Sequence, residues 1–368
     1  MAQSKHNSYP PLSPRFWNGM RLGPYLGLLA ENGFRIHPFR WPMFGLGFGV
    51  SCVNSVLGSV QDLVFSRRIA ATPIAEPPIF IIGHWRSGTT LIHELFTLDQ
   101  AFGYPSNFDT FAPSHILLSR PVMYPLMKIL MPGKRPMDAM SLSANSPQED
   151  DFALLSLGAP TIYRDIAFPN RRFNRQPLEA AAAQEKTRRA MLYFLKLLTL
   201  HYQRPLVLKS PPHTARVKNL SEWFPGARFL HISRHPFQIM ASTIKLWRAL
   251  DETQGFQLPK YSDEQLQDYV FEQQRHMYER YFAEAPTIPQ ENLIEIRFED
   301  LIADPKSEMS RIYSRWNLAG FDDLAPKIDN YFADRQEVKP TSQTIDRDVQ
   351  ALIVERWSRY MERFGYSA

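Results

Sequence analysis

Four short runs of apolar, β-branched residues recur along the chain, each bounded by glycine, proline or charged residues. They cover residues 79–82, 206–208, 229–232 and 293–296. Continuous apolar runs of this length are typical of parallel strands that are covered on both faces. Helical patterns lie around and between them, at 89–98, 179–202, 214–224, 236–250, 263–285, 306–316 and 348–364. This alternation predicts an α/β fold with a central parallel sheet flanked by helices.

Two segments depart from the alternation. Residues 1–75 are rich in proline, tryptophan, phenylalanine and arginine, and they predict a helical N-terminal extension that ends in the segment AEPP. The α/β domain is expected over residues 76–368. Within it, the proline-rich residues 100–175 predict an irregular insertion that lines a substrate cleft.

The composition narrows the class of partner. The net charge is +5, but basic residues are spread along the chain and form no block typical of a nucleic-acid-binding arm. We therefore expect no nucleic-acid partner, although the mild positive charge suits an anionic small ligand. Cys52 is the single cysteine, and the sequence has no zinc-type cluster. A reducing, cytoplasmic location and a mechanism without a metal are expected.

One stretch of the N-terminal extension approaches membrane-spanning length, which is ~20 apolar residues. Residues 43–60 are apolar but contain Asn54, three serines and several glycines. This mixture predicts a buried or interfacial helix. A peripheral membrane contact through residues 41–65 is the alternative.

The first strand runs into a loop with the spacing of a phosphate-binding P-loop. Gly83 and Gly88 frame the loop, and a helical pattern begins at Thr89. Backbone N–H groups of such a loop and helix start can surround an anion. A nucleotide triphosphatase would place lysine at position 89, whereas here the cation is Arg86, inside the loop. Arg86, Ser87, Thr89 and Thr90 can all donate to an anion, so the loop predicts an anion site.

A second cluster follows the third strand. The strand ends at Ser233 and Arg234, Pro236 suits a helix start, and Ser242 lies eight residues after Arg234. That spacing allows both side chains to reach one phosphate. Taken alone, the pair is as well explained by an arginine that caps a carbonyl and a serine on a solvated helix face.

The two clusters together resemble the sulfotransferase family that uses 3′-phosphoadenylyl sulfate (PAPS). In that family a [KR]-x-G-T-T loop binds the 5′-phosphosulfate, which matches Arg86, Ser87, Gly88, Thr89 and Thr90. An arginine followed eight residues later by serine binds the 3′-phosphate, which matches Arg234 and Ser242. The segment IRFEDLIADP resembles the family's YEDL segment but has phenylalanine in place of tyrosine, and PQEDDFAL and LKSPPHT resemble a bacterial subgroup.

The resemblance implies transfer of a sulfuryl group from PAPS to a hydroxyl or amine. Such transfer needs in-line positioning, stabilisation of the leaving phosphate and removal of the acceptor proton. By analogy Arg86 takes the role of the family's loop lysine beside the bridging oxygen. A small molecule, a carbohydrate and a lipid are all open as acceptors.

The proton-accepting residue is the least defined. Family members use a histidine, or a glutamate that would fall close to Asn107, and Asp109 is the nearest acid. We expect Asp109 to be the base, with His93, one turn into the loop helix, as the alternative. Lys209 ends the second strand at the ligand edge and is a further candidate for contact with the transferring group.

Two other functions remain open. A P-loop kinase is disfavoured by Thr89 in the lysine position. A non-catalytic nucleotide-binding protein of the same fold would retain the donor site without a base.

Overall fold

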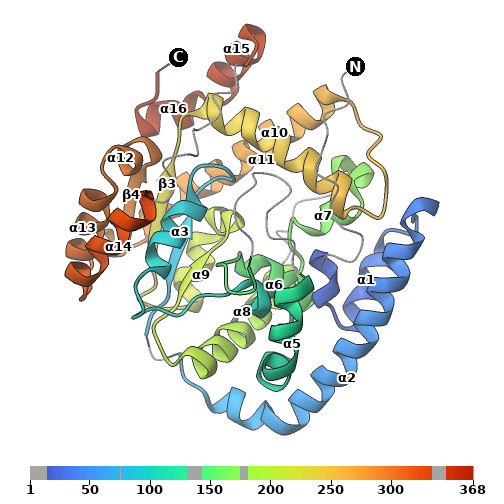
Figure 1. Cartoon of the computed structure of the whole chain (residues 1–368). Helices are drawn as coiled ribbons and strands as arrows, with labels where there is room; N and C mark the ends of the chain where they lie inside the picture. The colour runs from blue at the N-terminus through green and yellow to red at the C-terminus, as the bar shows by residue number, and fades with distance from the viewer. Residues whose placement is uncertain (1–14, 75, 131–142, 175–180, 334–344, 368) are drawn as a thin grey trace. The chain divides into compact units, whose positions relative to one another are not determined.

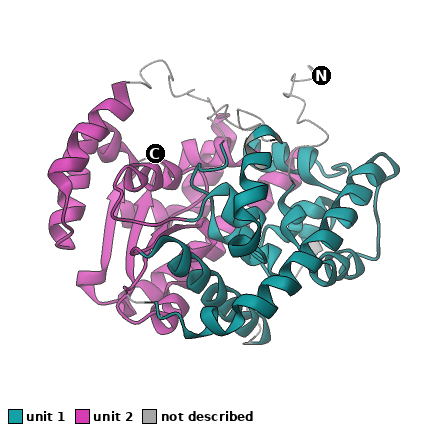
Figure 2. Ribbon diagram, turned by 60° about the horizontal axis from the view of Figure 1, so that its bottom comes forward, with its two compact units in different colours: residues 1–74, 105–203, 245–262 teal, residues 75–104, 204–244, 263–368 magenta. Residues whose placement is uncertain are grey.

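A computed structural model describes residues 15–74, 76–130, 143–174, 181–333 and 345–367 of the chain. The chain divides into two compact units (Figure 2). Unit 1 comprises residues 1–74, 105–203 and 245–262, and unit 2 comprises residues 75–104, 204–244 and 263–368. The predicted domain at 76–368 is therefore shared between both units, and its expected boundaries stay a prediction.

Unit 2 contains the predicted parallel sheet (Figure 1). Its strands are β1 (Ile79–Ile82), β2 (Val207–Lys209), β3 (Arg228–Ser233) and β4 (Leu293–Arg297), in the order β2-β1-β3-β4. All three pairings are parallel, with Ile82 opposite His231 and Ile81 opposite Lys209. The central strands are fully or almost fully buried, which explains their unbroken apolar runs. The sheet brings the carboxyl ends of β1, β2 and β3 to one edge.

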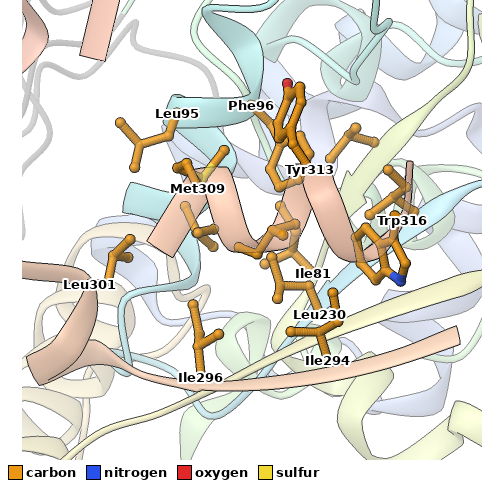
Figure 3. Packing of buried hydrophobic residues seen from close by; sticks show 14 of the residues in the cluster. Ile81, Leu95, Phe96, Leu230, Ile294, Ile296, Leu301, Met309, Tyr313 and Trp316 are labelled. Carbon is orange, nitrogen blue, oxygen red and sulfur yellow. The ribbon is translucent and has the colours of Figure 1, made fainter. Parts of the chain in front are cut away.

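One face of the sheet is covered by four helices. They are α3 (Thr89–Thr97), α12 (Phe298–Ala303), α13 (Pro305–Arg315) and α14 (Phe321–Ala333). Ile81, Leu230 and Ile294 of the strands pack with Phe96 and Tyr313 of these helices in one buried cluster (Figure 3). This packing fixes α3, and with it the loop that precedes α3.

Alternate strand residues point to the other face. Phe80 contacts His213 and Phe224, and His231 stacks between Tyr281 and Phe364. The elements outside the first face in unit 2 are η4 (Pro211–Arg216), α9 (Val217–Trp223), α11 (Asp263–Glu284), η5 (Ala285–Thr287), η6 (Gln290–Asn292), α15 (Arg347–Arg356) and α16 (Ser358–Phe364).

The described part of unit 1 is helical. Its elements are η1 (Phe16–Gly19), α1 (Leu22–Glu31), η2 (Pro38–Arg40), α2 (Trp41–Ala71), α4 (Asn107–Phe111), α5 (Ile116–Leu130), α6 (Asp150–Ser156), α7 (Arg164–Ala167), η3 (Pro169–Asn174) and α8 (Ala181–Tyr202). Helix α10 (Pro236–Gln254) begins in unit 2 and ends in unit 1. The N-terminal extension is helical, as predicted. Residues 1–14 of that extension, 131–142 of the insertion and the start of the helix predicted from 179 lie outside the described residues.

Three helices differ from their predicted form. The stretch 43–60, predicted to be a buried or interfacial helix, belongs to the longer α2. Only 22% of its most apolar part is buried, which disagrees with a buried helix and leaves the interfacial one. Residues 38–71 are long and apolar enough to cross a membrane by length and composition. The helix predicted at 214–224 starts as the 3-10 turn η4, which begins with Pro211 and Pro212. The helix predicted at 348–364 is broken at Trp357, whose indole N–H donates to the carbonyl of Phe271.

Candidate functional site

The loop between β1 and α3 holds a conformation that depends on glycine. The φ angles of Gly83 and Gly88 are 144° and 108°, in the region that favours glycine. A Cβ atom at position 83 would lie 2.5 Å from the carbonyl oxygen of Ile232, and one at position 88 would lie 2.3 Å from Cδ2 of Phe298. Arg86 has a φ of 68°, which is uncommon for a residue with a side chain. Such strained backbone is retained mainly where function requires it.

Neighbouring elements of unit 2 anchor this loop. The amide of Gly83 donates to Oγ1 of Thr214 at 2.7 Å, and the Thr214 hydroxyl donates back to the Gly83 carbonyl at 3.2 Å. The Ser87 amide donates to the His84 carbonyl at 3.1 Å. The hydroxyl of Ser87 is buried and has no hydrogen-bond partner among the described residues. A buried hydroxyl in a glycine-framed loop at the start of α3 suits an anion, because the helix start adds partial positive charge.

The two predicted anion motifs lie in contact. Nε of Arg86 donates to Oγ of Ser242 on α10 at 2.8 Å. Nη1 of Arg234, which directly follows β3, donates to the carbonyl oxygen of Arg86 at 2.9 Å. The parallel register of β1 and β3 explains the meeting, because both segments leave the same edge of the sheet. One site therefore contains two guanidinium groups, a serine hydroxyl and the α3 helix start.

Arg234 is held by residues from three other segments. Its guanidinium lies over the ring of Phe298 at 4.2 Å, and its Nε donates to Gln238 at 2.9 Å. The Tyr360 hydroxyl accepts from the Arg234 amide at 3.0 Å and donates to its carbonyl at 2.8 Å. Burial and the charge of Arg86 lower the pKa of Arg234 from its ordinary value. Two cations that repel each other in this way are stabilised by an anion between them.

Tyr360 and Tyr366 were not expected near this site from the sequence, and Phe298 was noted only as the phenylalanine in place of tyrosine in the FEDL segment. The Tyr366 hydroxyl donates to the Glu299 carboxylate at 2.9 Å, and that carboxylate also accepts from the His235 amide at 2.9 Å. These contacts hold the turn between β3 and α10. No short-range pattern marks the two tyrosines. The position of Phe298 in the EDL segment was the one signal available, and the structure shows its ring against Arg234 and Gly88.

Two other predicted residues, His93 and Lys209, also lie in unit 2. His93 is fully buried on α3, with its ring edge-on to Tyr104 at 6.2 Å between centroids. Lys209 is buried at the end of β2, opposite Ile81 of β1. His213 is buried in η4, so neither of these basic residues is a surface side chain. Glu94, which follows His93 on α3, accepts a hydrogen bond from the Tyr331 hydroxyl.

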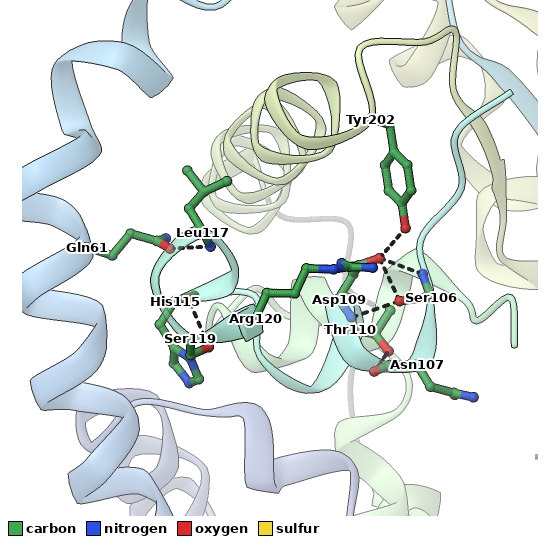
Figure 4. A network of polar contacts seen from close by, with 10 residues as sticks. All are labelled: Gln61, Ser106, Asn107, Asp109, Thr110, His115, Leu117, Ser119, Arg120 and Tyr202. Carbon is green, nitrogen blue, oxygen red and sulfur yellow. Dashed lines mark hydrogen bonds and ion pairs between the residues drawn. The ribbon is translucent and has the colours of Figure 1, made fainter. Parts of the chain in front are cut away.

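Asp109 lies in unit 1 and is engaged by a polar network (Figure 4). Its Oδ2 accepts from the Ser106 amide, the Ser106 hydroxyl and the Tyr202 hydroxyl at 2.7–2.9 Å, and its Oδ1 pairs with Arg120 at 2.6 Å. Ser106 and Asp109 form a capping box at the start of α4. The pattern Ser106-x-x-Asp109 in the sequence resembles this motif, in which the acidic side chain accepts a hydrogen bond from the backbone at the helix start.

A second acidic group lies in unit 1. Asp150 and Asp151 begin α6 and are fully buried. Glu149, directly before them, accepts a hydrogen bond from the Tyr163 hydroxyl. No group of three or more histidine, cysteine, aspartate or glutamate residues suited to a metal ion is found in the described ranges.

Comparison with known proteins agrees on one family. Residues 77–323 match the model of the sulfotransferase family. The chain is 36% identical over 355 residues to omega-hydroxy-beta-dihydromenaquinone-9 sulfotransferase Stf3 of Mycobacterium bovis and of Mycobacterium tuberculosis, covering 95% of this chain and 91% of each relative. The crystal structure of sulfotransferase STF9 from Mycobacterium avium superposes with a TM-score of 0.67 at 19% identity, covering 95% of this chain and 97% of that one. That of STF1 from Mycobacterium tuberculosis H37Rv gives 0.65 at 17% identity, covering 92% of both.

Proposed function

Because this chain belongs to the sulfotransferase family, we propose that it transfers a sulfuryl group from PAPS to a hydroxyl of a lipid. The observation that carries the choice of donor is the 2.8 Å contact between Arg86 and Ser242. It joins the loop suited to a 5′-phosphosulfate with the strand-end motif suited to a 3′-phosphate. A donor with only one phosphate group would need only one of the two.

The residues present suit this donor. Arg86, Ser87, Thr89 and Thr90, with the backbone at Gly88, would hold the 5′-phosphosulfate. Arg234 and Ser242 would hold the 3′-phosphate. The unpartnered Ser87 hydroxyl supports the first assignment. The contact of Arg234 with Arg86 supports the second, because burial and the charge of Arg86 lower the pKa of Arg234 and a bound anion would offset this repulsion.

In the proposed reaction the acceptor oxygen forms a bond to sulfur as the bond from sulfur to the bridging oxygen breaks. The leaving group is 3′,5′-adenosine bisphosphate. Arg86 would stabilise the negative charge that develops on the bridging oxygen, and Lys209, buried at the same sheet edge, would assist it. The acceptor proton leaves with a protein base.

We assign the role of the base that takes the acceptor proton to His93 in preference to Asp109. A base needs a lone pair directed at the acceptor, and both oxygens of Asp109 already accept hydrogen bonds or an ion pair within unit 1. His93 lies on α3, one turn after the anion loop. Under this assignment His93→Gln loses about 100-fold in kcat. Retention of full turnover by this variant would overturn the assignment.

The lipid acceptor is proposed from the relative named for omega-hydroxy-beta-dihydromenaquinone-9, whose identity to this chain extends over nearly its whole length. The test is acceptor-dependent consumption of PAPS labelled in its sulfuryl group. We expect label in an omega-hydroxylated menaquinone and none in a carbohydrate or peptide pool. Binding of 3′,5′-adenosine bisphosphate without transfer to any acceptor would favour the non-catalytic alternative.

A further inference from the structure

The long helix α2 has the reverse of the polarity expected for a helix on a globular protein. Its buried residues recur every three or four positions and form one stripe, and most of them are small or polar: Gly47, Ser51, Asn54, Gly58 and Gln61. A surface helix ordinarily buries an apolar stripe and exposes a polar one. Here the polar stripe faces unit 1.

Hydrogen bonds within unit 1 engage this buried stripe. Nδ2 of Asn54 donates to the Asn18 carbonyl at 2.7 Å, and its Oδ1 lies 3.0 Å from Nε2 of His115. Gln61 accepts from the Leu117 amide at 2.9 Å, and its Nε2 donates to the carbonyl of Ser114 at 3.0 Å. The side chains of Asn54 and Gln61 are therefore hydrogen-bonded within unit 1, and rotation of α2 to bury its apolar side would break these bonds.

The opposite side of α2 is apolar and exposed. We call it the outer face, and its exposed large side chains are Trp41, Leu46, Phe48, Val53, Val56, Val60, Leu63 and Val64. Val56 is 65% and Leu63 is 85% exposed, so these side chains are not partly buried residues at the edge of the core. Soluble proteins rarely leave a contiguous apolar surface of this kind without a partner.

Helix α5, which packs beside α2, adds further exposed apolar residues. Val122, Leu126 and Ile129 are 73%, 43% and 80% exposed and recur with helical spacing. The exposed Phe39 of η2 lies directly before α2. Exposed apolar residues therefore lie on two helices that pack together and on the turn that leads into the longer one.

Cations lie near both ends of α2. Arg35 lies before α2, and Arg40 is the residue directly before its first residue. Arg67 and Arg68 occupy the last turns of α2. The one acid of α2, Asp62, pairs with Arg21 at 2.7 Å. Aromatic and aliphatic side chains between flanking arginines are the pattern of helices that lie in a membrane interface, where the cations meet anionic headgroups.

We propose that the outer face of α2, with the exposed residues of α5, docks on the surface of an anionic lipid bilayer. The helix lies in the plane of the membrane. A crossing helix would carry Asn54 and Gln61 into the hydrocarbon and lose the bonds that fix them to unit 1. A protein partner would need shape-matched pockets, whereas a bilayer requires only apolarity and flanking positive charge, and both are present. The inference is independent of the assigned donor and acceptor.

Co-sedimentation of the full chain with vesicles tests this surface. Vesicles of phosphatidylcholine with phosphatidylglycerol should bind the protein, and vesicles of phosphatidylcholine alone should bind it more weakly. Val56→Glu and Leu63→Glu should each reduce binding by about tenfold or more, because a charge is placed at the apolar contact. Arg67→Ala with Arg68→Ala should reduce only the preference for the anionic vesicles.

Ile302→Glu is the matched control, since Ile302 is 43% exposed on α12 of unit 2 and the change is the same. It should bind vesicles as the natural chain does. Thermal melting of each variant reports whether it folds. The proposal is overturned if the natural chain does not sediment with anionic vesicles, or if Val56→Glu and Leu63→Glu bind undiminished. It is also overturned if sedimentation velocity shows a dimer that these changes dissociate, with no vesicle binding.

Discussion

Arg86 and Ser242 are 156 residues apart in the chain, yet the Nε of one donates to the Oγ of the other at 2.8 Å. Arg86 belongs to the loop after β1, and Ser242 to the helix after β3. Their contact depends on the parallel pairing of these strands, because it places the carboxyl ends of both strands, where the loop and the helix begin, at one edge of the sheet. It unites two motifs that separately indicate only an anion site.

The first prediction concerns Arg86. Arg86→Ala should lower kcat by about 100-fold with a small effect on the KM of the acceptor. The positive charge of Arg86 is needed to stabilise the negative charge that develops on the leaving oxygen. Arg86→Lys should restore part of the rate, since it returns the charge without the planar guanidinium. Steady-state kinetics with PAPS measure both. An unchanged kcat in Arg86→Ala would remove this residue from the chemistry.

Ser242→Ala tests the second motif. Loss of a hydrogen bond to charged partners should raise the KM for PAPS about tenfold and leave the KM for the acceptor unchanged. Thr253→Ala on the same helix is the control, because the Thr253 hydroxyl donates to carbonyls of its own helix. Equal KM values for the donor in the two variants would contradict a role for Ser242 in donor binding.

Phe298 supports Arg234 through its ring, which lies 4.2 Å from the guanidinium carbon. Phe298→Ala should raise the KM for PAPS about fivefold, as expected for the loss of a partly buried cation–π contact. Phe298→Tyr keeps the ring and should bind PAPS as well as the natural chain. If both variants bind PAPS equally well, the ring does not position Arg234.

Asp109→Asn separates structure from chemistry. Loss of the charge opposite Arg120 should reduce the free energy of unfolding by about 3 kcal/mol, because Asp109 is fully buried. The folded variant should retain most of its kcat. Chemical denaturation and kinetics at one temperature measure the two effects, and a large loss of kcat at unchanged stability would restore Asp109 as the base.

Buried histidines make stability depend on pH. Burial lowers the pKa of His84 and His115 to about 4 and that of His231 to about 3, from 6.5. These side chains are neutral in the folded protein and become charged on unfolding below pH 6.5, so stability is present above that pH and falls as pH decreases towards 4. The slope near pH 5 should reach about 4 kcal/mol per pH unit for three protons.

The change in melting temperature between pH 7.5 and 5 measures this effect. His231→Phe, whose ring would fit between Tyr281 and Phe364, should reduce the dependence on pH by about a third. The same dependence in this variant and in the natural chain would contradict a neutral, buried His231.

The sheet could be predicted because each strand is a short unbroken apolar run, and every predicted run overlaps an observed strand. The two anion motifs could be located because spacing around Gly83, Gly88 and Arg234 marks them, and the structure brings Arg86, Arg234 and Ser242 together. The role of these residues in donor binding stays a prediction. Tyr360 could not be predicted, since it reaches Arg234 from 126 residues away with no local pattern. Its role follows from packing of α16 alone.

The orientation of α2 could not be predicted either. Asn54 and the serines of this stretch predicted a buried or interfacial helix, but composition does not report which face of the helix a residue occupies. In the structure Asn54 is consumed by bonds inside unit 1, and the apolar residues point outward. The setting of Asp109 could not be predicted for a related reason, because the sequence does not show that its carboxylate is held by a capping box and by Arg120. Its role as a base stays a prediction.

Calorimetric titration with 3′,5′-adenosine bisphosphate and with 5′-adenosine monophosphate tests the central claim that both motifs form one donor site. In the natural chain, removal of the 3′-phosphate should weaken binding at least about tenfold. In Arg234→Ala the two nucleotides should bind with nearly equal affinity, because the group that recognises the 3′-phosphate is gone. Equal affinities already in the natural chain, or an undiminished difference in Arg234→Ala, would contradict the account.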